Sequence, residues 1–396
     1  MRILIVSNLF PPIVFGGYEI LCRQVVEELR RRGHEVSVLT SDFMANSVSA
    51  VEGVSRTLKL TTNFPRPGES VGKVDFSLRG MHRVGRYNAR QLEHALDDFS
   101  PDLVFCWCLN RLGAGLVRRA EELGIPVYYT INDEHPRQFR YTEAPRSLRQ
   151  WARSVAERLL SDSTFRKVSK IRMTVISNAL KRNLLALGAP VVDARVIYQG
   201  VDLKQFPFRA TPRKGNEPLR VLYVGQLSQV KGVHTLLEAV SRLRCDFRLT
   251  VVGAGVPEYE AGLREIARGH GLESKVQFRG KLSRAEVVEQ YQLNHVLVFC
   301  SEWEEPFGLT HLEAMASGCA VVSTTTGGSA ELVAHGHNAL AYEAGRAEDL
   351  ASRLETLEKD ENLRQRLLHD ARCYVEKHHC LQGYVTELEE WLTPAG

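Results

Sequence analysis

The sequence alternates short β-branched runs with amphipathic helical patterns, and this alternation limits the possible folds more than any other feature. In the first cycle, an apolar run over 2–6 is followed by a loop and by a helical pattern over 18–32, which ends at Gly33. Further strands are expected at 35–40, 103–106, 127–130, 173–176 and 195–198. Strands and helices that alternate in this way form parallel sheets, so the sequence predicts an α/β fold.

The alternation is interrupted once and then starts again. Residues 199–218 are rich in proline and glycine and hold few apolar residues after Phe208, which indicates an interdomain linker. After it, strands are expected at 220–224, 247–252, 276–278, 296–300 and 320–323. The chain therefore reads as two doubly wound domains in tandem. Ligands of such sheets bind beyond the carboxyl ends of the strands, so we expect the site in the cleft between the domains.

The predicted organisation has four parts. A first doubly wound domain is followed by a linker, by a second doubly wound domain, and by a C-terminal helix that packs back on the first domain. These parts are predicted at 1–203, 204–218, 219–375 and 376–396.

Composition and charge exclude several classes of protein. The 396 residues are too many for one compact core. The net charge of +4 is modest, and the sequence has no stripe of basic and aromatic residues of the kind that binds nucleic acid. No run of about 18 apolar residues would span a membrane. The first strand leads to Pro11 too soon for a signal peptide, and the eight cysteines form no C-x-x-C pair. We therefore expect a cytoplasmic protein.

The stretch 137–182 is locally basic, with twelve Arg or Lys residues and three acids. Apolar residues at helical spacing lie within it, from Leu148 to Leu159. One interpretation is a helix that faces the core and has a solvated basic face. The other is a surface for the acceptor or for peripheral contact with an anionic membrane at its inner face.

The strongest functional signal is the string SEWEEPFGLTHLEAMASG over 301–318. A strand is expected to end at Cys300 and a helix to begin near Gly308, which leaves several free N–H groups and a partial positive charge that suit a phosphate. Glu305 precedes the helix, and Glu313 lies eight residues further on. Carboxylates bind hydroxyl groups strongly, so a ligand with hydroxyls on both sides of a phosphate fits this arrangement. A nucleotide-sugar is such a ligand.

This string resembles the Glu-x7-Glu signature of the group-1 (family 4) retaining GT-B glycosyltransferases. The resemblance implies a GT-B fold, with two Rossmann-like domains and a donor/acceptor cleft between them. The domain over 1–203 would be the acceptor-side domain and that over 219–375 the nucleotide-sugar donor domain. It also implies that Glu305 contacts the donor sugar and that Glu313 contacts the ribose. The backbone around Phe307, Gly308 and Leu309 would then hold the sugar and the diphosphate.

Further segments extend the resemblance over nearly the whole chain. Gly225, Gln226 and Lys231 match the family's G-R-L-x3-K-G loop, whose Lys binds the donor diphosphate. Gln226 stands where the family usually has Arg, which removes one cation from the phosphate site. The paired Gly16 and Gly17 match a loop whose backbone approaches a donor or acceptor phosphate, although a tight turn explains a glycine pair equally well.

Three other matches are weaker. Base recognition in the family is through backbone groups, which here places Leu282 near the base. The segment from Gly200 to Phe206 matches an interdomain hinge. Gly327, Gly328 and Glu331 match a family segment near the donor, for which a plain turn between a strand and a helix is the alternative.

Asn132 and Asp133 are the residues expected on the acceptor side of the site, because they follow an expected strand. The family often has His-Asp here. Asn132 can still donate a hydrogen bond to a sugar hydroxyl but cannot titrate. Asp133, Glu134 and His135 do not suggest a metal site, because adjacent side chains point apart. No Asp-x-Asp occurs either, so we expect neither a metal nor another cofactor.

The resemblance implies a retaining glycosyltransferase that moves a hexose-type sugar from a UDP- or GDP-sugar to a hydroxyl acceptor. A glycolipid, a polysaccharide or a small metabolite would serve as the acceptor. In the family's usual mechanism the acceptor attacks from the front face and the leaving diphosphate takes its proton, so Glu305, Lys231, Asn132 and Asp133 act by position and charge. Two alternatives remain. One is a catalytically inactive nucleotide-binding subunit, and the other is a sugar-nucleotide epimerase or phosphorylase with the same fold.

Overall fold

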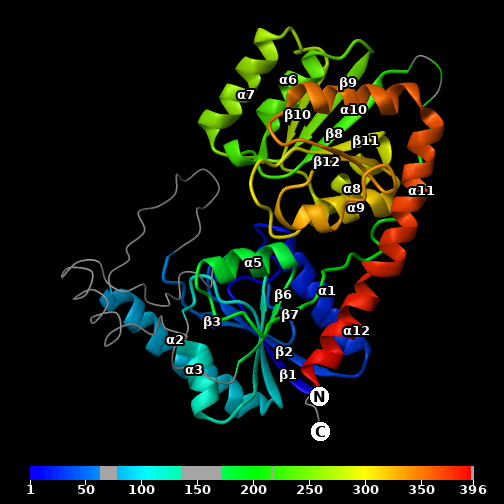
Figure 1. The fold of residues 1–396 in the computed structure, drawn as a ribbon. Helices are drawn as coiled ribbons and strands as arrows, with labels where there is room; N and C mark the ends of the chain where they lie inside the picture. The colour runs from blue at the N-terminus through cyan, green and yellow to red at the C-terminus, as the bar shows by residue number, and fades with distance from the viewer. Residues whose placement is uncertain (63–77, 114, 135–170, 214, 216, 394–396) are drawn as a thin grey trace. The chain divides into compact units, whose positions relative to one another are not determined.

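A computed structural model describes residues 1–62, 78–113, 115–134, 171–213, 215 and 217–393 (Figure 1). The chain divides into two compact units. The first unit contains Met1–Ile197 and Val385–Gly396, and the second contains Tyr198–Tyr384. Each unit is built around its own parallel sheet, which confirms the predicted α/β class.

The first unit has a seven-stranded sheet in the order β3-β2-β1-β4-β5-β6-β7. Its strands are β1 (Arg2–Ser7), β2 (Glu35–Ser41), β3 (Val54–Leu58), β4 (Leu103–Cys108), β5 (Val127–Ile131), β6 (Arg172–Val175) and β7 (Arg195–Val196). All six strand pairings are parallel. The strand order reverses between β1 and β4, the kind of point at which open α/β sheets bind ligands.

Helices cover the first sheet. They are α1 (Gly17–Arg31), α2 (Leu78–Phe99), α3 (Gly115–Glu122) and α5 (Asn178–Ala186), with a short 3-10 turn η1 (Ala45–Ser47). In α1 the buried residues Leu21, Val25 and Leu29 recur at helical spacing and form the face that packs on the sheet. Because both faces of the sheet are covered, β4 is buried along its whole length.

The last residues of the chain belong to the first unit, although they follow the second in sequence. Helix α12 (Leu381–Leu392) carries Trp391, whose ring meets Tyr128 edge-on at 5.0 Å between centroids. Glu389 accepts one hydrogen bond from Arg32, at 2.9 Å, and pairs with the His34 ring at 2.7 Å. These contacts hold the C-terminal residues on β4, β5 and the end of α1.

The second unit has a six-stranded sheet in the order β10-β9-β8-β11-β12-β13. Its strands are β8 (Leu219–Val224), β9 (Phe247–Val252), β10 (Val276–Gly280), β11 (Val296–Phe299), β12 (Ala320–Thr324) and β13 (Leu340–Tyr342). Helices α6 (Val233–Ser241), α7 (Pro257–Gly269) and α10 (Ala347–Lys359) cover one face, and α8 (Arg284–Leu293), α9 (Leu309–Ser317) and α11 (Glu361–His378) the other (Figure 1). Two 3-10 turns, η4 (Gln229–Lys231) and η5 (Gly327–Glu331), complete the unit.

The division between the units falls ahead of the predicted linker over 204–218. Within that stretch, Phe206 is fully buried and Phe208 packs against the core of the second unit. The segment is poor in apolar residues, but its two phenylalanines anchor it to one unit. Among the helices of the described residues, none is both long and apolar enough to cross a membrane.

Candidate functional site

The start of α9 is shaped by Gly308. This residue caps the helix with φ of 127°, in the region that favours glycine. A Cβ at Gly308 would lie 2.7 Å from Nδ1 of His311, so no larger residue fits without a shift. The loop after β11 therefore turns sharply into α9 and leaves the first N–H groups of the helix without partners within the helix. This helix start is suited to an anion.

Lys231 and Glu305 form an ion pair beside this helix start. The Glu305 side chain is 9% exposed and that of Lys231 is 22% exposed. The Lys231 ammonium also lies 5.3 Å from the centroid of the Trp303 ring, a cation–π contact. Two residues that lie 74 positions apart in the chain, and that the sequence proposed separately, are thus brought together.

Gly232 fixes the position of the Lys231 turn. It has φ of 66°, and a Cβ there would lie 2.0 Å from the carbonyl oxygen of Cys300. The backbone N–H of Glu302 donates to the Val230 carbonyl at 2.9 Å. The turn that carries Lys231 therefore packs directly against the end of β11, backbone to backbone.

Gly327 and Gly328 support the Glu305 loop from the other side. The N–H of Gly328 donates to the carbonyl of Glu305 at 2.6 Å. A Cβ at Gly327 would lie 2.5 Å from that same oxygen, and one at Gly328 would lie 2.3 Å from the Pro306 carbonyl oxygen. The glycine pair thus lets η5 approach the loop closely and hold it in place.

Glu313, the second acid of the motif, lies on α9 and is 4% exposed. Its Oε2 accepts from the Tyr291 hydroxyl at 2.9 Å, and its Oε1 lies 2.7 Å from Nη2 of Arg284. Burial alone would lower the pKa of Arg284, but the Glu313 carboxylate outweighs burial and raises it. The guanidinium also lies over the ring of Phe206, 4.6 Å from its centroid. Sequence reasoning missed both partners of Glu313.

His311 is a further residue that the sequence did not single out. It is fully buried, with Nε2 2.7 Å from the Ser323 hydroxyl and Nδ1 3.2 Å from the Gly308 carbonyl. Its ring lies 4.1 Å from that of Phe299 between centroids. Burial lowers the pKa of His311 to about 4, so the imidazole is neutral and serves as a support beneath the start of α9.

The remaining donor candidates of the second unit lie in loops at the carboxyl edge of its sheet. Gln226 is exposed after β8, and its carbonyl accepts from the Tyr223 hydroxyl at 2.8 Å. Leu282 lies between β10 and α8. Phe307 is buried and stacks on Tyr198 at 6.0 Å, and Leu309 begins α9. The structure thus gathers these residues on the same edge as the ion pair.

The glycine pair of the first unit lies at the start of α1. Gly16 caps the helix, and its N–H donates to Oε2 of Glu19 at 2.8 Å. Glu19 is fully buried, and burial raises its pKa. Glu19 was not singled out from the sequence as a capping residue. An acid three residues after the residue that caps a helix is the signal that could have identified it.

Asn132 and Asp133 follow β5 at the carboxyl edge of the first sheet. The Asn132 amide donates to the carbonyl of Trp107 at 2.9 Å and to that of Thr130 at 3.3 Å. Those bonds fix the amide on the end of β4. His135, and the part of the basic stretch that runs from 137 to 170, lie outside the described residues. Among the residues that are described, no group of three or more His, Cys, Asp or Glu is placed to hold a metal ion.

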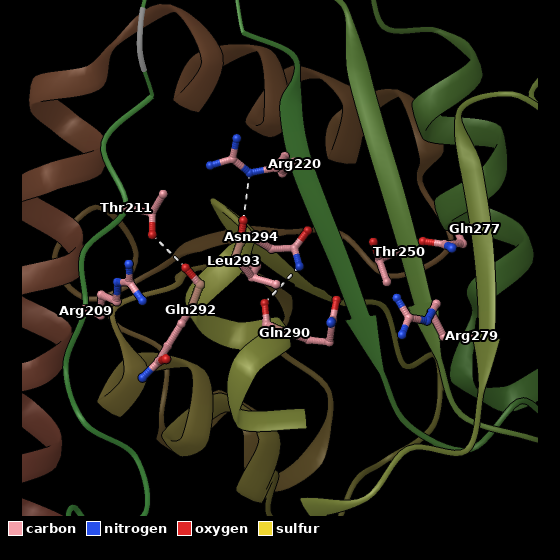
Figure 2. Close-up of a pocket in the computed structure, with 10 residues that line it drawn as sticks. All are labelled: Arg209, Thr211, Arg220, Thr250, Gln277, Arg279, Gln290, Gln292, Leu293 and Asn294. Carbon is pink, nitrogen blue, oxygen red and sulfur yellow. Dashed lines mark hydrogen bonds between the residues drawn. The ribbon is translucent and has the colours of Figure 1, made fainter. Parts of the chain in front are cut away.

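The second unit also has a separate polar hollow of about 510 Å³ on the face that carries α8 (Figure 2). It is lined by Arg209, Thr211, Arg220, Thr250, Gln277, Arg279, Gln290, Gln292, Leu293 and Asn294. Several of its polar groups bond to α8: the Thr211 hydroxyl donates to the Gln292 carbonyl at 2.6 Å, and Arg220 Nε to the Leu293 carbonyl at 2.7 Å. None of the candidate donor residues lines this hollow.

Two family models match adjoining parts of the chain. The model described as "Glycosyl transferases group 1" matches residues 205–373, and "Glycosyltransferase Family 4" matches residues 15–205. Together they span residues 15–373, which include every candidate site residue named above.

Similar proteins are found by sequence and by structure. A glycogen synthase of Mycobacterium tuberculosis is 27% identical over 386 residues, which cover 94% of this chain and 89% of that protein. A D-inositol 3-phosphate glycosyltransferase of Pseudarthrobacter chlorophenolicus is 25% identical over 87% of this chain and 82% of its own. Sucrose-phosphate synthase of Thermosynechococcus elongatus has a TM-score of 0.73 at 20% identity, over 98% of both chains. Anabaena HepE, in complex with UDP-glucose, has a TM-score of 0.72 at 20% identity, over 99% of both.

Proposed function

Because the chain belongs to the group-1, family 4 glycosyltransferases, we propose that it moves a hexose from a UDP- or GDP-sugar to a hydroxyl acceptor with retention at the anomeric carbon. That it is an enzyme that transfers a sugar from a nucleotide-sugar follows from its family and relatives. The predicted GT-B fold of two Rossmann-like domains is confirmed by the two parallel sheets and the solved structures. The observation that carries the finer proposal is the contact of Lys231 with Glu305 at the start of α9.

In this proposal the diphosphate lies against the start of α9 and Lys231. The Lys231 ammonium has three N–H donors, of which one is held by Glu305, so donors remain for phosphate oxygens. The helix start adds a partial positive charge. Together they stabilise the negative charge that develops on the leaving diphosphate, and we propose that the reaction needs no metal ion.

Glu305 has a second role in the proposal, as the acceptor of a hydrogen bond from a hydroxyl of the donor sugar. Its carboxylate is nearly buried, and the Lys231 contact keeps it oriented. A charge-assisted bond in such a site is stronger than one in water. Because the same carboxylate orients Lys231, sugar and diphosphate would be positioned by one pair of side chains.

The acceptor would bind through the first unit, with Asp133 accepting a hydrogen bond from its hydroxyl. The predicted donor role of Asn132 does not fit, because its amide nitrogen already donates to the carbonyls of Trp107 and Thr130. The proposed attack is on the front face, with the leaving diphosphate taking the acceptor proton, so that the protein supplies position and charge. A glycolipid, a polysaccharide or a small metabolite would supply the hydroxyl. The proposed cellular setting is the cytoplasm, and membrane contact through 137–182 remains a prediction.

Binding of the donor nucleotide is tested first by thermal shift with UDP, GDP, ADP and dTDP. A nucleotide at ten times its Kd stabilises the protein by about 1.4 kcal/mol. We expect one base to shift the wild type and to shift Glu313→Ala much less. Glu265→Ala, which removes an exposed acid from α7, is the matched control and should behave as wild type. No shift with any nucleotide at millimolar concentration would contradict the proposal.

The reaction itself is tested with the donor of that base. Incubation with donor and a panel of hydroxyl acceptors should give a product with the anomeric configuration of the donor by NMR, with or without EDTA. Glu305→Ala should lose transfer. Tight nucleotide binding with no turnover of any donor would instead support the inactive-subunit alternative, and conversion of the donor alone would support an epimerase.

A further inference from the structure

Glu313 is held by two side chains of α8 and still has room for a ligand. A carboxylate can accept about four hydrogen bonds. Arg284 occupies a position on Oε1 and Tyr291 one on Oε2, and no other bond to the carboxylate occurs among the described residues. Each oxygen therefore keeps an acceptor position, and the side chain is 5% exposed. The two open positions suit two neighbouring hydroxyl groups, such as the 2′- and 3′-hydroxyls of a ribose.

Arg284 is itself held rigidly. Its guanidinium lies over Phe206, which is fully buried, at 4.6 Å from the ring centroid. Its Nε is buried and has no hydrogen-bond partner among the described residues. A buried N–H group without a partner costs free energy. The hydrogen bonds that Arg284 makes therefore do not by themselves explain why an arginine occupies this position. What the residue supplies is a fixed positive charge 2.7 Å from Oε1 of Glu313.

We propose that Arg284 is a positioning residue for the nucleotide, which holds the Glu313 carboxylate turned so that it binds both ribose hydroxyls. Arg284 thereby makes the enzyme select ribonucleotide over 2′-deoxyribonucleotide donors. This inference rests on the proposed function, because it takes Glu313 as the ribose contact. It adds a residue that the Glu-x7-Glu signature does not contain.

The ribose does not take part in the reaction, so its contacts are the same in the bound substrate and in the transition state. Loss of Arg284 should therefore raise KM and leave kcat nearly unchanged. One charge-assisted hydrogen bond corresponds to about a tenfold change in affinity. We expect Arg284→Gln to raise KM for the donor about tenfold, and Arg284→Lys to restore part of the loss because it keeps the charge.

The decisive measurement compares Kd for UDP, ADP and GDP with Kd for their 2′-deoxy counterparts, by calorimetry. Wild type should bind the preferred ribonucleotide about tenfold more tightly than its deoxy form, and Arg284→Gln should bind the two nearly equally. Arg264→Gln is the matched control, because Arg264 also stacks on a ring, at 4.5 Å from the Phe278 centroid, and has no ion pair among the described residues. It should keep the wild-type ratio.

Two results separate the possible failures. If wild type binds no nucleotide, the proposed function fails and the inference fails with it. If wild type binds and discriminates, but folded Arg284→Gln keeps the wild-type ratio of ribo- to deoxyribonucleotide affinity, only the inference is overturned. A fall in kcat with an unchanged ratio would also overturn it. Thermal unfolding without ligand shows whether each variant is folded.

Discussion

Replacement of Lys231 by methionine removes the positive charge of the site and little else. Methionine has a similar length and remains compatible with the Trp303 ring, which the Lys231 ammonium faces at 5.3 Å. The Glu305 carboxylate would lose its ionic partner while its side chain stays 9% exposed. The substitution therefore tests two consequences of one contact, one on stability and one on rate.

The effect on stability follows from the burial of the pair. Breaking a buried ion pair costs about 3–5 kcal/mol, because the remaining charge is left uncompensated. An exposed pair contributes about 0–1 kcal/mol. With Glu305 nearly buried and Lys231 22% exposed, we expect Lys231→Met to lower the free energy of unfolding by about 2 kcal/mol. Lys231→Met combined with Glu305→Gln should recover most of this, because the amide carries no charge.

The effect on rate follows from the proposed role at the diphosphate. Loss of one group that stabilises the developing charge typically lowers kcat by about 10²–10³-fold. Urea unfolding gives the stability, and initial rates at saturating donor give kcat. Lys275→Met is the matched control, because Lys275 pairs with Asp246 at 2.9 Å on the surface. It should change neither quantity appreciably.

Two results would refute this reasoning. A Lys231→Met enzyme with wild-type kcat would mean that the ammonium does not act on the leaving group. A double variant no more stable than Lys231→Met would mean that the carboxylate of Glu305 was never destabilised by the loss of its partner.

Two other predictions concern stability. His295, His311 and His379 are buried, and burial lowers their pKa from 6.5 to about 3, about 4 and about 4. They stay neutral in the fold and protonate on unfolding, so the melting temperature should fall as pH drops from 6.5 towards 4; each contributes up to about 1.4 kcal/mol per pH unit. His295→Gln should flatten this dependence, and an equally steep profile would contradict the assignment. Trp391→Ala removes the packing of α12 on Phe105 and should cost about 2–3 kcal/mol in urea unfolding. It should also expose the C-terminal residues to protease; unchanged stability would show that Trp391 does not anchor the helix.

The fold was readable from the sequence because its signals are local. Each strand–loop–helix cycle places its apolar period within a few dozen residues, and a glycine such as Gly33 marks a helix end. The strand β3 was not predicted because Val54–Leu58 has apolar residues only at its two ends and shows no alternating pattern. It lies at the edge of the sheet, where only Leu58 of its five residues is buried. The linker was predicted from its low content of apolar residues. Such a count does not show that a single buried residue, such as Phe206, attaches the segment to the second unit.

The partners of Glu313 were not readable, for a different reason. Arg284 and Tyr291 lie on α8, 22 residues or more before Glu313, and the strand β11 lies between them and Glu313 in the chain. An arginine near a helix start has the same local appearance whether it faces solvent or a buried acid. Only the packing of α8 beside α9 decides the matter, and that packing depends on contacts made throughout the unit.

The glycines show how the site is held in shape. The sequence placed Gly308, Gly327 and Gly328 in loops near a ligand, and for Gly327 and Gly328 a plain turn was the alternative. In the structure, a Cβ at Gly232, Gly327 or Gly328 would lie within 2.5 Å of a backbone oxygen of a neighbouring loop. Three loops therefore pack backbone against backbone around the Lys231 contact. Because backbone groups set the geometry, loss of the Lys231 side chain should alter charge without moving the start of α9, which is why its effect on kcat measures electrostatics.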